Sequence, residues 1–369
     1  MNKLKIYYLT YQDFPANTAN SQQTISTCKY LAKNNIKVKL IFPLRSQNSS
    51  SDLDKIFDFY NFEEKLFTIM GLPFYGKFQS KYFKKFNYLY KHIFWSYYAV
   101  NNILNSKSLP DAFITRSDWI YYFLSRKNLN VTYECHKLTK LRKFILTKSI
   151  NYKNSKIIFL NKKLLLDSGL KKYDKNKILI QNGGYDDEFF QKKFKKDQKT
   201  VIFTGNLYRL GKERNLKFVI NAFQDKRLKD FNLKIIGGTE NDLIKFNKEF
   251  SDVKNVTFKK YLSKDLLSIE LGVSEIGLLI NDNNYHSMYH TDPLKYYEYI
   301  ASDLKIIAVD FPSHREFEKN GNIVFFEHNN YESFIKALLK ISESNFSIDK
   351  NLQITTQDQR VKNMINFIL

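Results

Sequence analysis

The sequence predicts an α/β protein made of two Rossmann-like, doubly wound domains that face a cleft. Strand-like and helix-like segments alternate from the first residues onward, and this alternation indicates a parallel sheet with right-handed crossovers. The pattern stops in a polar, strongly basic stretch at residues 191–199 and then starts again. Two such halves in succession place a ligand cleft between them, at the carboxyl ends of the strands. The chain has 369 residues, which suits two domains of ordinary size.

Residues 1–190 are expected to form the first domain. Short apolar runs predict its strands, and amphipathic runs between them predict its helices. The expected strands are Lys5–Thr10, Val38–Phe42, Ala112–Thr115, Val131–Glu134, Lys156–Leu160 and Lys177–Gln181. Helices are expected at Ser21–Asn34 and Asn161–Gly169, so strands and helices alternate.

Residues 191–355 are expected to form the second domain. Its predicted strands are Val201–Thr204, Lys234–Ile236, Val256–Phe258, Ile276–Ile280, Lys305–Val309 and Ile323–Phe326. Helices are expected at Asn215–Phe223 and Pro293–Ala301. Neither domain has the G-x-G-x-x-G fingerprint of dinucleotide binding, which weakens a dehydrogenase hypothesis.

The net charge is +22, from 59 basic and 37 acidic residues. Such a charge favours nucleic acid, anionic lipid or phosphorylated substrates as partners. Only nine of the basic residues are arginine, and the abundance of Lys, Asn, Ile, Phe and Tyr is the composition expected from an AT-rich genome. Scarce arginine argues against sequence-specific recognition of DNA, so no specific nucleic-acid partner is expected.

Cysteine usage and the apolar segments predict a cytoplasmic protein. The two cysteines, Cys28 and Cys135, fit neither a disulfide framework nor a metal-binding spacing, which is typical of a reducing compartment. The apolar run near the N-terminus is too short for the core of a signal peptide. No segment approaches the roughly 20 apolar residues of a membrane-spanning helix.

The segment HTDPLKYYEYIASDLKIIAVDFPSHRE, residues 290–316, is the most informative part of the sequence. Asp292 is expected to cap a helix that opens with Pro293. Lys295 and Glu298 are three residues apart and therefore share a helical face. Free N–H groups, the helix dipole and a lysine would suit a phosphate, and Glu298 could accept hydrogen bonds from two neighbouring hydroxyls. The alternative is a plain capped helix with an ion pair between residues 295 and 298.

This segment resembles the sPLK-x-x-EYxAxxxPIIA signature of the family 4 retaining glycosyltransferases, which have the GT-B fold. The matching residues are Pro293, Leu294, Lys295, Glu298, Tyr299 and Ala301. The resemblance implies that the helix start contacts the diphosphate of a nucleotide-sugar donor and that Glu298 binds the ribose. Many members carry a further glutamate eight residues before the second one, and this chain has His290 there.

Other stretches resemble the same family in the same order. Residues 201–223 resemble the strand, glycine turn and helix that open the second domain, which implies donor contacts by Gly205, Arg209 and Lys212, with Arg214 as a substitute. Physically, paired cations in a cleft suit a leaving diphosphate, whereas the alternative is ordinary surface charge. Residues 255–267 resemble the stretch beside the base, where Tyr261 could stack on the base or belong to the core.

The first domain supplies further candidates. His136 follows an apolar strand in a stretch that resembles the family's YExH motif, which implies a place beside the donor sugar. Glu134 lies on the same side of that strand and is expected to orient His136. Thr18, Asn20 and Ser21 follow the first strand and are candidates for contacts with donor or acceptor. The resemblance also implies that a terminal helix at about residues 356–369 packs back on this domain.

A basic and aromatic stretch at residues 74–95 suggests a surface partner. No acidic residue occurs between Leu66 and Pro110, and lysines alternate with rings throughout residues 74–95. Such a stretch can lie on an anionic membrane, can stack single-stranded nucleic acid, or can pack as a helix with a solvated lysine face. The membrane hypothesis is favoured here because the acid-free run is long and rich in rings.

The favoured hypothesis is a glycosyltransferase that moves a sugar from a UDP- or GDP-linked donor to a glycan or lipid-linked acceptor. A lipid-linked or surface-polysaccharide precursor is the expected acceptor, at the inner face of the membrane. Retention of configuration is implied by the resemblance, and no metal is expected, since the only D-x-D, at Asp52 and Asp54, lies in a Ser-rich loop. The alternatives are a nucleotide-sugar epimerase on the same fold and a non-catalytic basic protein with a decayed donor site.

Overall fold

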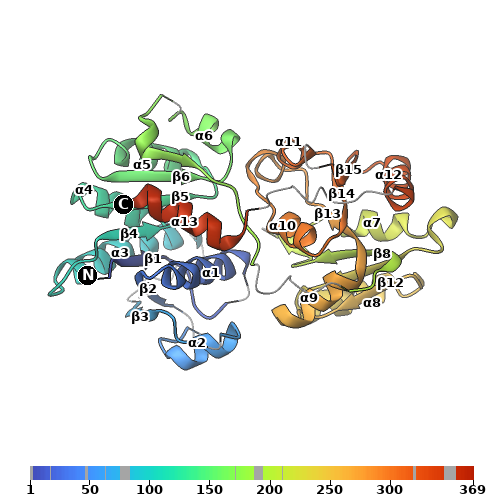
Figure 1. Cartoon of the computed structure of the whole chain (residues 1–369), viewed down its shortest axis with the longest axis horizontal. Helices are drawn as coiled ribbons and strands as arrows, with labels where there is room; N and C mark the ends of the chain where they lie inside the picture. Colours follow the sequence, from blue (N-terminus) through green and yellow to red (C-terminus); the bar gives the residue numbers. More distant parts are fainter. Residues whose placement is uncertain are drawn as a thin grey trace. The chain divides into compact units, whose positions relative to one another are not determined.

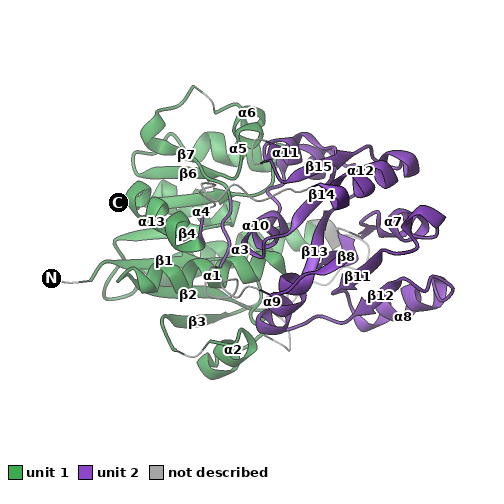
Figure 2. Cartoon of the chain, turned by 45° about the vertical axis from the view of Figure 1, so that its right-hand side comes forward, with its two compact units in different colours: residues 1–182, 357–369 green, residues 183–356 purple. Residues whose placement is uncertain are grey.

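The computed structural model describes residues 3–369 apart from residues 17, 46–48, 63, 75–83, 171, 187–193, 210, 319–320 and 345–354. The chain forms two compact units (Figure 2). Unit 1 comprises residues 1–182 and 357–369, and unit 2 comprises residues 183–356. The expected boundary between residues 190 and 191 lies outside the described residues.

Unit 1 is built on a seven-stranded parallel sheet with the strand order β3-β2-β1-β4-β5-β6-β7. The strands are β1 (Lys5–Leu9), β2 (Lys37–Leu44), β3 (Thr68–Pro73), β4 (Ala112–Thr115), β5 (Val131–Cys135), β6 (Ser155–Phe159) and β7 (Ile178–Ile180). Six of them fall where apolar runs predict them, because helices cover both faces of a parallel sheet and its strands are therefore apolar throughout. β3 was not predicted, because its sequence, TIMGLP, contains glycine and proline, which are rare in strands. It is an edge strand that pairs only with β2.

Two helical layers cover this sheet. Alternate residues of β1 face opposite sides, so Ile6 and Tyr8 join one core cluster while Tyr7 and Leu9 join the other. The first cluster is covered by α1 (Ala19–Lys33), α2 (Leu53–Phe59) and α13 (Gln357–Ile368). The second is covered by α3 (Lys84–Leu104), α4 (Asp118–Arg126), α5 (Lys140–Ser149) and α6 (Lys162–Ser168). The terminal helix α13 packs against α1 (Figure 1).

Unit 2 is built on a six-stranded parallel sheet with the order β12-β11-β8-β13-β14-β15. Its strands are β8 (Asp197–Thr204), β11 (Asn232–Ile236), β12 (Val256–Lys259), β13 (Ser274–Leu279), β14 (Lys305–Val309) and β15 (Ile323–Phe326). A small hairpin of β9 (Tyr208–Arg209) and β10 (Lys212–Glu213) follows β8.

Helices lie on both faces of the second sheet as well. One core cluster lies under α7 (Leu216–Ala222), α8 (Glu240–Glu249) and α12 (Tyr331–Glu343). The opposite cluster lies under α9 (Lys264–Val273) and α10 (Leu294–Ala301). The remaining helical segments are η1 (Lys175–Lys177), η2 (Lys226–Leu228), η3 (His286–His290) and α11 (Pro312–Arg315). The prediction of two doubly wound α/β domains is confirmed.

Among the described residues, no helix combines the length and the apolar character that crossing a bilayer requires.

Candidate functional site

Two glycine turns meet at the carboxyl edge of the unit 2 sheet. Gly205 follows β8 and Gly237 follows the neighbouring strand β11, with φ angles of +110° and +124°. The Gly205 N–H donates to the Ile236 carbonyl at 2.8 Å, and a Cβ on Gly237 would lie 2.5 Å from the Gly205 carbonyl oxygen. Side chains would clash here, so glycine leaves bare backbone at the centre of this edge.

Helix α10 is held close to the same edge by its buried tyrosines. The Tyr299 ring occupies the place that a side chain on Gly277 of β13 would need. Its hydroxyl donates to the carbonyls of Ile202 and Leu278 at 3.4 and 3.3 Å. Tyr296 stacks on Phe317 with 3.8 Å between ring centres. These contacts fix the direction in which the first turn of α10 presents its side chains.

The start of α10 corrects the expected capping by Asp292. Pro293 occupies the N-cap position, the helix begins at Leu294, and no side chain caps it. Asp292 instead accepts hydrogen bonds from the backbone N–H of Gly183 and, at 2.8 Å, from the Tyr297 hydroxyl. The Asn-Gly-Gly turn at residues 182–184 thereby packs against the helix start, and the first N–H groups of α10 are left without a side-chain cap.

Lys295 places a buried amino group beside the Gly205 turn. Its Nζ lies 3.6 Å from the centre of the Phe203 ring and has no hydrogen-bond partner among the described residues. It also lies 3.2 Å from the point where a Cβ on Gly205 would stand. Burial and the neighbouring Arg214 hold the pKa of Lys295 well below its usual range. Among the described residues, Lys295 forms no ion pair with Glu298, so the alternative of a plain helix with an ion pair between these two residues is not observed.

Arg214 reaches the same glycine from the other side. Its Nη1 lies 3.8 Å from the same Cβ position, and its Nε donates to Asn281 Oδ1 at 3.0 Å. Burial, together with the adjacent Arg209, lowers the pKa of Arg214 to about 10. Two cations converge on bare backbone beside an uncapped helix start, which is an arrangement that favours a multiply charged anion.

The other two basic candidates, Arg209 and Lys212, lie on the two strands of the β9–β10 hairpin and differ in exposure. Arg209 is partly buried, and its Nη2 lies 3.3 Å from His286 Nε2. The charge of Arg209 helps to lower the pKa values of Arg214 and Lys295, so Arg209 belongs to the same cationic group. Lys212 is exposed on β10. Arg214, which the sequence offered only as a substitute, takes the place beside Gly205 that was expected for Lys212.

Glu298 lies one turn deeper on α10 among polar side chains. Burial raises the pKa of Glu298, whereas Lys295 and Lys264 oppose that rise. Lys264 also pairs with Asp186 at 3.5 Å. The nearby Tyr261 is 44% exposed. A partly buried carboxylate beside a partly exposed aromatic ring can bind hydroxyl groups on a molecule whose flat part stacks on that ring.

His290 ends the short π-helix η3 just before α10. Its ring is buried and lies 5.2 Å from the Tyr285 ring and 6.0 Å from the His286 ring, measured between centres. The π-helix therefore presents two histidines beside the cationic group, because His286 also contacts Arg209. Leu294 lies against the 182–184 turn, where it approaches the Cβ position of Gly183 at 3.3 Å.

In unit 1, Glu134 does not orient His136 by a hydrogen bond, contrary to expectation. Its carboxylate accepts hydrogen bonds from Tyr8 at 2.8 Å, Arg116 at 3.0 Å and Arg360 at 2.5 Å. Burial opposes the ionisation of Glu134, but the two guanidinium groups outweigh burial and hold its pKa below the usual range. Since Arg360 belongs to α13, this buried cluster ties the terminal helix to β5.

The remaining unit 1 candidates surround the same edge of the first sheet. His136 follows β5, and its Nε2 is buried with no hydrogen-bond partner among the described residues. Burial keeps the pKa of His136 well below its usual range, so the ring is neutral at pH 7. Thr18 caps α1 by accepting from the Ser21 N–H at 3.1 Å, and Asn20 Oδ1 accepts from Arg116 at 2.8 Å.

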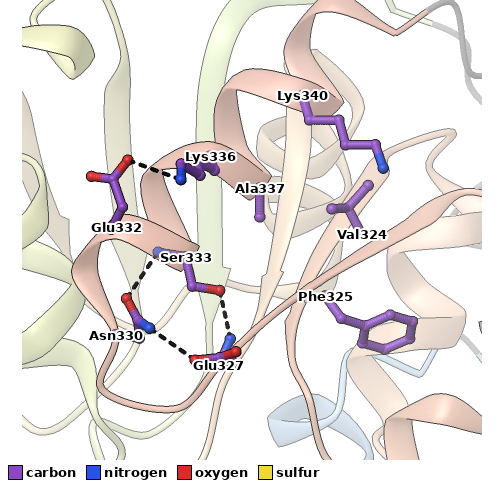
Figure 3. A pocket seen from close by; sticks show the side chains of 9 residues that line it. All are labelled: Val324, Phe325, Glu327, Asn330, Glu332, Ser333, Lys336, Ala337 and Lys340. Atoms are coloured by element: carbon purple, nitrogen blue, oxygen red, sulfur yellow. Dashed lines mark hydrogen bonds and ion pairs between the residues drawn. The ribbon is translucent and has the colours of Figure 1, made fainter.

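A separate open pocket of about 400 Å³ lies between β15 and α12 of unit 2 (Figure 3). Most of its polar side chains are already paired, since Asn330 bonds to Glu327 and Ser333 while Glu332 pairs with Lys336. No predicted site residue lines this pocket. In the part of the chain that the structure describes, no group of three His, Cys, Asp or Glu side chains could hold a metal ion.

The sequence interpretation missed several members of these groups. They are Phe203, Asn281 and His286 in unit 2 and Arg116 and Arg360 in unit 1. Arg116 carried a usable signal, because it is one of only nine arginines and directly follows the buried strand β4. Phe203 and Arg360 lie in an apolar strand and an ordinary amphipathic helix, where nothing in the local pattern distinguishes them.

The second half of the chain matches a known protein family. Residues 185–359 match the family model described as "Glycosyl transferases group 1". No curated protein sequence matches the chain.

Solved structures resemble the whole chain in fold. Sucrose-phosphate synthase from Thermosynechococcus elongatus is 13% identical with a TM-score of 0.67, over 99% of this chain and 96% of that one. A glycosyltransferase from Rickettsia africae is 13% identical with a TM-score of 0.66, over 100% and 98%. HepE from Anabaena, in complex with UDP and glucose, is 10% identical with a TM-score of 0.59, over 98% and 94%. At these identities the likeness establishes the GT-B fold.

Proposed function

This chain carries a glycosyl transferase group 1 domain on a GT-B fold, and from that premise we propose a hexosyl transfer from a UDP-linked sugar to a lipid-linked acceptor, with retention of configuration. Transfer of a sugar from a nucleotide sugar follows from the family. The choice of base, sugar, acceptor and stereochemistry is the proposal. Unit 2 is proposed to bind the donor, and unit 1 the acceptor.

The diphosphate of the donor is proposed to bind at the Gly205 turn. The observation that carries the proposal is the buried Nζ of Lys295, which has no partner among the described residues and stands beside the bare backbone of Gly205. Burying an ammonium group without a partner is costly, and a phosphate oxygen would supply that partner. Arg214 and Arg209 would add two further charges, and the uncapped first turn of α10 would add N–H donors.

The nucleoside is proposed to lie over Glu298 and Tyr261. Glu298 is one turn from Lys295 on the same helix, so a diphosphate at the helix start places a ribose within its reach. Its carboxylate would accept hydrogen bonds from the two ribose hydroxyls, and the Tyr261 ring would stack on the base. Uridine is proposed as the nucleoside because HepE, which shares the fold, binds UDP.

His290 of unit 2 is proposed to contact the donor sugar. The His290 ring is buried at the end of η3. In unit 1, burial keeps the pKa of His136 well below its usual range, and a neutral imidazole can donate one hydrogen bond and accept another from sugar hydroxyls. His136 would also steady charge as the glycosidic bond breaks. Transfer is proposed to need no divalent metal, because Lys295, Arg214 and Arg209 together match the charge of the leaving diphosphate.

The acceptor is proposed to be a lipid-linked or surface-polysaccharide precursor at the inner face of the cytoplasmic membrane. The basic stretch at residues 74–95 supports a membrane contact, although residues 75–83 lie outside the described residues. The terminal helix α13 is proposed to keep unit 1 folded around its acceptor side through the bond from Arg360 to Glu134.

The donor site can be tested by measuring the binding of UDP and, separately, of its two fragments, uridine and pyrophosphate. Isothermal titration with UDP, uridine and inorganic pyrophosphate would be run on the native protein, Lys295→Met and Glu298→Gln. Lys295→Met should lose pyrophosphate and keep uridine, whereas Glu298→Gln should lose uridine and keep pyrophosphate. Equal effects of the two variants on both fragments would contradict the proposed placement, and so would binding of GDP or ADP in preference to UDP.

Turnover would be tested with UDP-hexoses and lipid-linked acceptor, with and without EDTA, and with NMR of the anomeric proton of the product. Retention and an EDTA-insensitive rate are the expected results. UDP binding without turnover on any acceptor would favour the non-catalytic alternative. Interconversion of the UDP-sugar without an acceptor would identify an epimerase instead.

A further inference from the structure

Helix α3 carries aromatic rings on the face turned away from its core. Trp95, Ala99 and Ile103 are buried against the sheet. Phe86, Tyr90, Phe94 and Tyr97 follow one another at spacings of four, four and three residues, so they lie on one helical face. These four side chains are between 42% and 62% exposed. The solvent face of a surface helix is normally polar, so this row of exposed rings marks a candidate docking surface.

The row continues onto the neighbouring helix. α4 packs beside α3 on the same side of the unit 1 sheet. The ring of Phe123 lies 5.5 Å from that of Tyr97, and Trp119 and Tyr122 adjoin Phe123 at 6.2 and 5.6 Å between ring centres. Arg126 lies over the Tyr122 ring at 5.7 Å. Tertiary packing therefore joins residues from two helices into one surface.

The third helix of this layer adds positive charge and two more apolar side chains. α5 packs beside α4 and exposes Lys140, Leu141, Lys143, Phe144 and Lys148. The only acidic residue in α3, α4 and α5 is Asp118. It is buried and bonded to Arg142 at 3.2 Å. The exposed face of the three helices, here called the aromatic face, thus presents rings and cations and no exposed carboxylate.

We infer that the aromatic face docks flat on an anionic lipid bilayer. The rings of α3 and α4 would lie at the interface between headgroups and acyl chains, where Tyr and Trp are favoured, and the lysines of α5 would contact lipid phosphates. A second copy of this chain would bring like charges together, which disfavours self-association through this face. The inference deepens the proposed lipid-linked acceptor and rests on it for its purpose, but its test does not involve the donor site.

Vesicle sedimentation of the full chain would test the face. Phosphatidylcholine vesicles would be compared with vesicles that also contain phosphatidylglycerol. The double variant Phe86→Ser/Phe94→Ser removes two exposed rings, and Ile244→Ser/Leu266→Ser removes two equally exposed apolar side chains of unit 2 as a control. The ring variant should weaken binding to anionic vesicles by about tenfold or more, and the control should match the native protein.

Two double lysine variants test the contribution of positive charge to vesicle binding. Lys143→Gln/Lys148→Gln should weaken binding to anionic vesicles, whereas Lys245→Gln/Lys248→Gln on α8 should have little effect. In a Trp95→Phe background Trp119 is the only tryptophan, and lipids brominated on their acyl chains should quench its fluorescence. Absence of quenching would overturn the inference, as would equal losses in test and control variants.

The remaining outcomes separate this inference from its rivals. Rings that are needed for binding single-stranded oligonucleotide and not vesicles would overturn the membrane assignment. A dimer that the ring variant abolishes without lipid would overturn it as well. UDP titration of the same variants keeps the donor proposal distinct: vesicle binding can fail while UDP still binds, and UDP binding can fail while vesicles still bind.

Discussion

The ε-amino nitrogen of Lys295 lies 3.6 Å from the centre of the Phe203 ring, at the end of the strand that leads into Gly205. The ring face attracts the cation, but this attraction is weaker than a hydrogen bond to an anion in the same place. The neighbouring Arg214 and Arg209 repel the same charge. The free protein therefore gives the Lys295 amino group no anionic partner, and a bound diphosphate would supply one.

Replacing Lys295 by Met should reduce affinity for UDP by roughly tenfold to hundredfold, because a charge-assisted bond to phosphate is lost. Lys212→Met is the matched control, since Lys212 is exposed on the adjoining hairpin and should change affinity by about twofold at most. Isothermal titration measures both. A larger loss in the Lys212 variant would move the diphosphate from the Gly205 turn to the hairpin.

The same substitution should stabilise the protein without ligand. The folded state depresses the pKa of Lys295, so between that depressed value and 10.5 the unfolded state binds more protons and stability rises with pH. Lys295→Met should be more stable than the native protein at pH 7. The difference should narrow as pH rises towards 10.5, by at most about 1.4 kcal/mol per pH unit. Urea unfolding at several pH values measures it, and a constant difference would show that folding does not depress the pKa of Lys295.

Glu134→Gln should destabilise unit 1 by about 3 kcal/mol, because it leaves Arg116 and Arg360 buried without their common anion. The folded state depresses the pKa of Glu134, so this stabilisation is complete above pH 4.5 and is lost as pH falls below it. The difference in melting temperature between native protein and variant should thus shrink between pH 6 and pH 3. Asp111→Asn, at an exposed carboxylate of the same unit, serves as the control.

Gly237→Ala should destabilise unit 2 and weaken UDP binding together. The added methyl would stand 2.5 Å from the Gly205 carbonyl and would force the two turns apart. Gly211→Ala is the control, since its φ is also positive, at +80°, but nothing lies within 4 Å. The Gly237 variant should cost about 1–3 kcal/mol more than the Gly211 variant, by thermal unfolding. Equal costs would mean that only backbone strain matters.

His136→Ala should lower kcat by roughly a hundredfold if the ring steadies the departing sugar. Burial keeps the pKa of His136 well below 6.5, so the native enzyme should show no change of rate from this group between pH 6 and pH 9. The pH–rate profile of kcat measures this. A rate that rises through pH 6.5 and flattens in the His136→Gln variant would show that the imidazole titrates and acts as a base.

The sequence by itself determined the two sheets and the helix that starts the candidate site. Parallel strands buried on both faces are continuous apolar runs, so strands β1, β4, β8 and β14 can be predicted from the sequence alone. The spacing of Lys295 and Glu298 on one helical face is likewise a local property of a helix. The resemblance at residues 293–301 then indicated the chemistry.

Only the tertiary structure decided which side chains meet. Asp292 stands at the sequence position of a helix cap, but its carboxylate accepts hydrogen bonds from Gly183 and Tyr297 instead of from the first turn of α10. Glu134 is paired with Arg116 and Arg360, which are distant in sequence and converge only when α13 packs against unit 1. Local patterns encode periodicity, whereas partners of buried charges depend on how separate elements pack, and that is why the first could be predicted and the second could not.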